Sequence, residues 1–118
     1  MRVNVLETEY KISVKKYDED ETFARESFSG YCDVCTKEIV ICDMSTYKGW
    51  EYESKETVEI AQKEILRHEI VHAFFKESGL FANANETYGS WARNEEMVDW
   101  IALQGVKLYD AWKAVDAV

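Results

Sequence analysis

The sequence contains no proline, and no stretch approaches the roughly 20 apolar residues that a membrane-spanning helix needs. Without proline, nothing resembles a rigid linker or a Pro-rich recognition segment. The N-terminus lacks the apolar core of a signal peptide and carries polar side chains, among them Arg2, Glu7 and Glu9. These absences predict a protein that stays in the cytoplasm.

Positive charge is also scarce. Lys and Arg number 14 against 23 Asp and Glu, which gives a formal net charge of −9. An acidic surface repels phosphate backbones and anionic lipids. The charge therefore argues against nucleic acid and membrane as direct partners.

Only three cysteines are present, Cys32, Cys35 and Cys42. The odd number and a reducing compartment argue against a disulfide framework. Cys32 and Cys35 have C-x-x-C spacing, but a structural zinc site needs four ligands and only Cys42 remains. We expect no function for these thiols.

The length of 118 residues predicts a single domain over residues 1–118, and 47% apolar residues can supply its core. Apolar alternation predicts a strand over residues 3–16 with a bulge or bend near Leu6, followed by a polar loop. An apolar, β-branched run predicts a hairpin of two strands at residues 31–35 and 38–43.

Helices dominate the second half of the chain. The longest is predicted to begin after Ser54 as N-cap and to end at Gly79. A loop should follow, then a helix over residues 91–104 and a short one after Gly105. The expected class is α+β: a small, mainly antiparallel sheet of about three strands, packed on one long helix and two shorter C-terminal ones.

Residues 68–72 read His-Glu-Ile-Val-His, the H-E-x-x-H pattern, inside the longest predicted helix. Side chains at i and i+4 lie one above the other, so His68 and His72 can reach one Zn²⁺. Glu69 is rotated away from the histidines and can act as a base beside the metal. These are the only two histidines, and an unpartnered pair on a buried helix would be costly.

A catalytic zinc needs a third protein ligand and an open position. No histidine remains, so we expect a carboxylate from the start of the second helix. Glu95 and Asp99 are i and i+4 there, which suits Glu95 as ligand and Asp99 as the acceptor that orients a ligating histidine. Glu96 is the alternative ligand. The acidic first turn could instead only complement the helix dipole.

A helical His-Glu-x-x-His followed by a second helix with Glu-x-x-x-Asp resembles the gluzincin branch of zinc peptidases. Residues 65–73, Ile-Leu-Arg-His-Glu-Ile-Val-His-Ala, together with the short chain and the preceding sheet, resemble the ImmA/IrrE-like metallopeptidases, which are common in phages and mobile elements. The match covers roughly residues 60–105. It implies a zincin-like fold and an endopeptidase that acts on an intracellular protein, often a regulatory one.

In the expected mechanism, zinc acidifies a bound water, Glu69 accepts its proton, and a further donor stabilises the oxyanion. Tyr88 is the candidate donor and Arg93 the alternative. The strand at residues 38–43 could pair with an extended substrate if it lies at a sheet edge; an interior strand is the other interpretation.

Two other function classes stay open at this point. The chain could be a non-catalytic zinc-binding interaction module of a phage or mobile element, although such a site has no use for Glu69. It could also be an interaction domain without metal.

Overall fold

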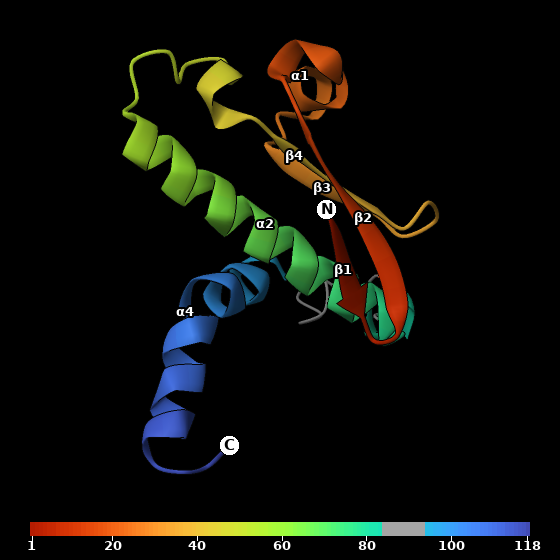
Figure 1. Cartoon of the computed structure of the whole chain (residues 1–118). Coiled ribbons are helices and arrows are strands. Elements are labelled where there is room, and N and C mark those ends of the chain that lie inside the picture. The colour runs from red at the N-terminus through yellow and green to blue at the C-terminus, as the bar shows by residue number, and fades with distance from the viewer. Residues whose placement is uncertain (84–93) are drawn as a thin grey trace.

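A computed structural model describes residues 1–83 and 94–118 of the chain. Four strands in the described part form one mixed sheet: β1 (Arg2–Val5), β2 (Thr8–Lys15), β3 (Gly30–Asp33) and β4 (Glu38–Cys42). The strand order is β1-β2-β4-β3; the central pair β2–β4 is parallel and the two outer pairs are antiparallel. The helices are α1 (Thr22–Glu26), α2 (Lys55–Glu77), α3 (Leu80–Asn83) and α4 (Glu95–Ala114), with 3-10 turns at Tyr17–Glu19 and Met44–Thr46 (Figure 1). The predicted α+β class is confirmed.

The N-terminal segment is a hairpin, so the prediction of one strand over residues 3–16 is wrong. Leu6 and Glu7 both have positive φ, 50° and 69°, which reverses the chain in two residues. The Asn4 side chain supports the turn by accepting a hydrogen bond from the Glu7 backbone N–H, at 2.9 Å. The predicted bend near Leu6 thus lies at the hairpin turn, but such turns usually carry Asn or Gly at these positions, so Leu-Glu did not mark a chain reversal. This hairpin raises the strand count from about three to four.

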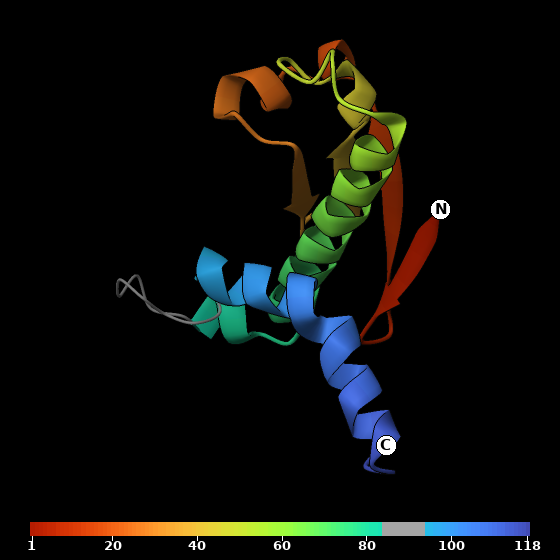
Figure 2. The ribbon, with the colours of Figure 1, turned by 90° about the vertical axis from the view of Figure 1, so that its left-hand side faces the viewer.

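Helix α2 lies across one face of the sheet (Figures 1 and 2). It begins where predicted, because the Ser54 hydroxyl caps the Thr57 N–H at 3.1 Å. It ends at Glu77, just before Gly79, whose φ is +83°. The main core between helix and sheet consists of buried side chains from three strands and the helix: Val5, Tyr10, Ile12, Ile39, Ile41 and Ala73.

Helix α4 is continuous over 20 residues, so the predicted break into two shorter C-terminal helices at Gly105 is wrong. The backbone at Gly105 is helical. A glycine typically ends a helix by adopting a left-handed conformation, and Gly105 does not adopt one. The C-terminal half of α4 extends away from the sheet and from α2 (Figures 1 and 2). In the described residues, no helix has the length and apolar character needed to cross a bilayer.

The end of α2 is tied to the sheet through Glu77. Its carboxylate accepts hydrogen bonds from the Thr8 hydroxyl at 3.1 Å, from the Tyr10 hydroxyl at 2.6 Å and from the Lys37 ammonium. The hydrogen bonds from Lys37 and then Tyr10 lower the pKa of Glu77 below its usual value. This carboxylate therefore anchors the helix and lies away from the two histidines.

Replacing Gly105 by Ala should stabilise the protein by about 0.5–1 kcal/mol, because Ala loses less backbone entropy in a helix and its Cβ meets nothing within 4 Å. Urea unfolding measures the change. Gly49→Ala is the matched control, since space is open there too but φ is +93°, and it should destabilise. A destabilised Gly105→Ala protein would contradict a continuous α4.

Replacing Glu77 by Gln should destabilise the protein by about 1–2 kcal/mol at neutral pH, because a charged acceptor is lost. A folded-state pKa below the unfolded one gives stability that is present above the unfolded pKa and is lost as pH falls through the folded pKa. The gap between wild type and variant, measured by thermal unfolding, should therefore shrink below about pH 4. Glu59→Gln, on the exposed side of α2, should show no such gap.

Candidate metal centre

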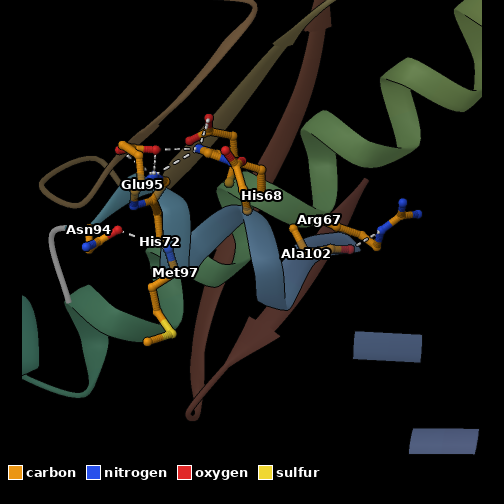
Figure 3. Close-up of polar contacts among 9 residues, drawn as sticks. Arg67, His68, His72, Asn94, Glu95, Met97 and Ala102 are labelled. Carbon is orange, nitrogen blue, oxygen red and sulfur yellow. Dashed lines mark hydrogen bonds and ion pairs between the residues drawn. The ribbon is translucent and has the colours of Figure 1, made fainter. Parts of the chain in front are cut away.

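Two histidines of α2 converge on one point. His68 and His72 are one helical turn apart, and their Nε2 atoms lie 3.1 Å from each other (Figure 3). The rings meet edge to face with their centroids 4.7 Å apart. The i, i+4 spacing thus brings both nitrogens to the same place, as the motif requires.

Glu95 at the start of α4 completes the cluster. Its Oε2 lies 3.1 Å from His68 Nε2 and 3.3 Å from His72 Nε2 (Figure 3). The Asn94 side chain caps α4 by accepting a hydrogen bond from the Met97 N–H at 3.1 Å, which fixes where the helix starts. Glu95 therefore enters the site in the first turn of a capped helix.

Packing of α4 on α2 holds this arrangement. Val98 and Ala102 of α4 are buried, and Val98 clusters with Phe75 of α2. The Arg67 side chain donates to the Ala102 carbonyl at 2.8 Å (Figure 3). His72 of α2 contacts Glu95 of α4, and Arg67 of α2 contacts Ala102 of α4. Residue numbers fall along one helix as they rise along the other, so the two helices run in opposite directions through the site.

The three ligand atoms have the spacing of a zinc site. Bonds of about 2.0–2.1 Å in tetrahedral geometry place neighbouring ligand atoms about 3.3 Å apart. The two histidine nitrogens and Glu95 Oε2 are separated by 3.1, 3.1 and 3.3 Å. In residues 1–83 and 94–118, this is the one group of three His, Cys, Asp or Glu side chains close enough to share an ion. Two imidazoles and one carboxylate are a donor set that fits zinc with an open fourth position.

Asp99 orients the first histidine. Its Oδ1 lies 2.6 Å from His68 Nδ1. When a neutral imidazole donates from Nδ1 to a carboxylate, its Nε2 keeps the lone pair and faces the cluster. Burial lowers the pKa of His72, and nearby His68 lowers it further while Glu95 opposes the change. Burial thus favours the neutral form of His72, which is the form that binds metal.

Glu69 is buried beside the cluster, with 7% of its surface exposed. Its Oε1 lies 3.9 Å from His68 Nε2, farther than the cluster atoms are from one another. Burial is the largest cause that raises its pKa, to about 7, while the charges of His68 and Lys76 act in the opposite direction. A carboxylate in this state can hold a proton or release it near neutral pH.

Strand β3 lies close to α2 at Gly30 and covers part of Glu69. A Cβ at Gly30 would lie 2.8 Å from Ile65 Cγ2 and 3.4 Å from Glu69 Cγ. Only glycine lets the strand lie this close to α2. Strand β3 therefore forms one wall over the base.

The cluster opens into a cleft of about 790 Å³ between β3, α2 and α4. Strand β4 is interior, paired on both sides, so the interpretation of residues 38–43 as a substrate-pairing edge is wrong. The edge that faces the cleft is β3, the first strand of the same hairpin. The sequence pattern predicted this hairpin correctly, but such a pattern does not indicate which of the two strands lies at the edge of the sheet.

The structure thus brings together His68, His72, Glu95, Asp99 and Glu69. Glu95, rather than the alternative Glu96, is the carboxylate near both histidines, and Glu96 is exposed. Tyr88 and Arg93, the two candidate oxyanion donors, lie outside the described residues.

Two cleft residues, Lys76 and Gly30, were missed from the sequence. Lys76 could have been found, since it follows His72 at the i+4 spacing that relates the two histidines. Gly30 carried no signal beyond being a glycine. Cys32 also lines the cleft, but burial raises the pKa of its thiol to about 11, so it stays protonated and is a poor nucleophile or ligand.

No protein-family model, no curated protein and no solved structure matches the chain.

Replacing Glu95 by Ala should weaken zinc binding by at least 10-fold, because one of three protein ligands is removed. Glu96→Ala is the matched control and should leave the affinity within about twofold, since its exposed side chain is not part of the cluster. Competition with a chromogenic chelator measures both affinities. Equal losses, or a larger loss for Glu96→Ala, would contradict the assignment.

Proposed function

We propose that this chain is a zinc-dependent endopeptidase with a zincin-like fold, acting on a protein in the cytoplasm. The observation that carries the proposal is the triangle of His68, His72 and Glu95 with a buried carboxylate, Glu69, beside it. The resemblance of residues 60–105 to the ImmA/IrrE-like metallopeptidases supports the same reading. A regulatory protein is the kind of substrate that this resemblance implies.

His68, His72 and Glu95 would hold the metal, with Asp99 keeping the His68 ring in place. Zinc at such a site supplies a Lewis acid, which lowers the pKa of water and polarises a carbonyl. The cleft leaves room on the β3 side of the cluster for a peptide group. The protein's own contribution is to fix the ligands and to place a base next to them.

Glu69 is the base in this proposal. It takes a proton from the attacking water as the water oxygen bonds to the carbonyl carbon. It then delivers that proton to the amide nitrogen as the C–N bond breaks, and the second proton of the water follows to the amine, so the products are a carboxylate and an ammonium group. Its burial under β3 keeps bulk water from competing for the proton.

Strand β3 gives the substrate a place to bind. The Ser29 carbonyl accepts from the Cys42 N–H of β4, and backbone groups alternate in direction along a strand. The groups of Gly30 and Cys32 therefore point away from β4. The Cys32 carbonyl already accepts a hydrogen bond from Lys76, so an extended peptide would pair with the Gly30 groups and the Cys32 N–H, with its scissile bond over the cluster.

Replacing Glu69 by Gln should leave zinc stoichiometry near one per chain and reduce peptide cleavage by about 10²–10⁴-fold, because the general base is lost and the ligands are not. Elemental analysis measures the metal, and mass spectrometry of a peptide mixture measures cleavage. Glu59→Gln, exposed on the same helix, is the matched control and should cleave like wild type.

Cleavage that survives in Glu69→Gln would refute this mechanism. A zinc-loaded wild-type protein that cleaves nothing would favour the alternative, a non-catalytic zinc-binding interaction module. Absence of bound metal at neutral pH would reject both.

A further inference from the structure

Four polar side chains follow one another along α2 at intervals of one turn: Glu64, His68, His72 and Lys76. All four line the cleft. The stripe therefore has a carboxylate at one end, the histidine pair in the middle and an ammonium group at the other end. A substrate lying along α2 meets opposite charges on the two sides of the metal centre.

Lys76 is held in place by the wall of the cleft. Its Nζ donates to the Cys32 carbonyl of β3 at 2.7 Å and lies 5.4 Å from the centre of the Phe81 ring. Among the described residues, it forms no ion pair with a carboxylate, whereas Lys37 is paired with Glu77. Its partners on the cleft wall are thus a neutral carbonyl and an aromatic ring.

The charge of Lys76 reaches the centre of the cleft. It is one of the causes that lower the pKa of Glu69, against the larger effect of burial. Lys76 is also the one Lys or Arg among the described residues that line the cleft. In a chain of net charge −9, this end of the cleft is a local exception to the acidic surroundings.

The geometry points to Lys76 as a specificity-determining residue that binds an Asp or Glu side chain of the substrate. The inference rests on the proposed function and adds a class of substrate to it. Lys76 lies four residues beyond His72, about 6 Å along the helix, which equals roughly two residues of extended peptide. The acidic residue should therefore lie about two positions from the scissile bond, on the side of the cleft away from Glu64.

Glu64 sharpens this selectivity. It lines the opposite end of the cleft and has no ion-pair partner within residues 1–83 and 94–118, so it repels a carboxylate placed there. The preference for acid should consequently be confined to one position of the peptide. At other positions, the net negative charge of the protein should disfavour it.

Binding of non-cleaved peptides tests the inference. The probe is a set of fluorescent octapeptides with blocked ends and an Ala/Leu sequence, in which a single Glu or its isostere Gln is moved through the positions. The protein is the full chain, loaded with zinc and carrying Glu69→Gln, so that binding is measured without hydrolysis. At low salt, Glu should bind about three- to fivefold more tightly than Gln at one position.

Lys76→Gln, added to this protein, should abolish the preference, because the amide can still donate to the Cys32 carbonyl but carries no charge. Lys63→Gln, exposed on the same helix, is the matched control and should keep it. Raising ionic strength from about 0.02 to 0.5 M should weaken the preference in the protein with Lys76 intact, which tests the charge without any change at that position.

The inference is overturned if Glu and Gln bind alike at every position, if nothing binds, or if the preference is insensitive to salt or to loss of Lys76. These results leave cleavage by the wild-type protein unaffected. Conversely, octapeptides that bind with the Glu preference but are never cut by wild type would refute the peptidase and leave the carboxylate site standing.

Discussion

The docking of α4 against α2 is the constraint on which the candidate metal centre depends. Helix α2 alone brings two imidazoles together, because their spacing is set by one turn of its backbone. The third donor, Glu95, and the orienting acceptor, Asp99, come from another helix. Buried Val98 and Ala102, and the hydrogen bond from Arg67 to the Ala102 carbonyl, are therefore part of the site even though they bind no ligand.

The docking of α4 on α2 brings several carboxylate side chains close together. The carboxylates of Glu69, Glu95 and Asp99 all lie around the imidazoles of His68 and His72, and Glu69 is buried. Grouping such side chains costs free energy unless a cation offsets it. A divalent ion would offset the repulsion and bridge the two helices at once. Under the proposed function, metal binding would therefore stabilise the α2–α4 contact.

Local chemistry could be predicted from the sequence; relations between distant segments could not. The helix carrying the histidines, its Ser54 cap and the hairpin before it followed from periodicity and capping residues. The alternation of apolar residues located a bend near Leu6, but the bend was not recognised as a hairpin turn because neither Leu6 nor Glu7 is of a type that marks a left-handed turn. Gly105 was taken as a helix end, although a glycine stops a helix only where the backbone turns. The parallel pairing of β2 with β4, which puts β3 at the edge, arises from tertiary packing alone.

Because Gly30 has no side chain, it limits which substitutions this arrangement of β3 and α2 can accept. A methyl group there would lie 2.8 Å from Ile65 Cγ2, so the Ile65 side chain or the strand would have to shift. A substitution remote from the histidines in sequence would thus disturb the strand beside Glu69 while leaving His68, His72 and Glu95 unchanged. A sequence pattern that specifies this architecture would therefore need a glycine at the start of the strand beside the motif helix, alongside His-Glu-x-x-His itself.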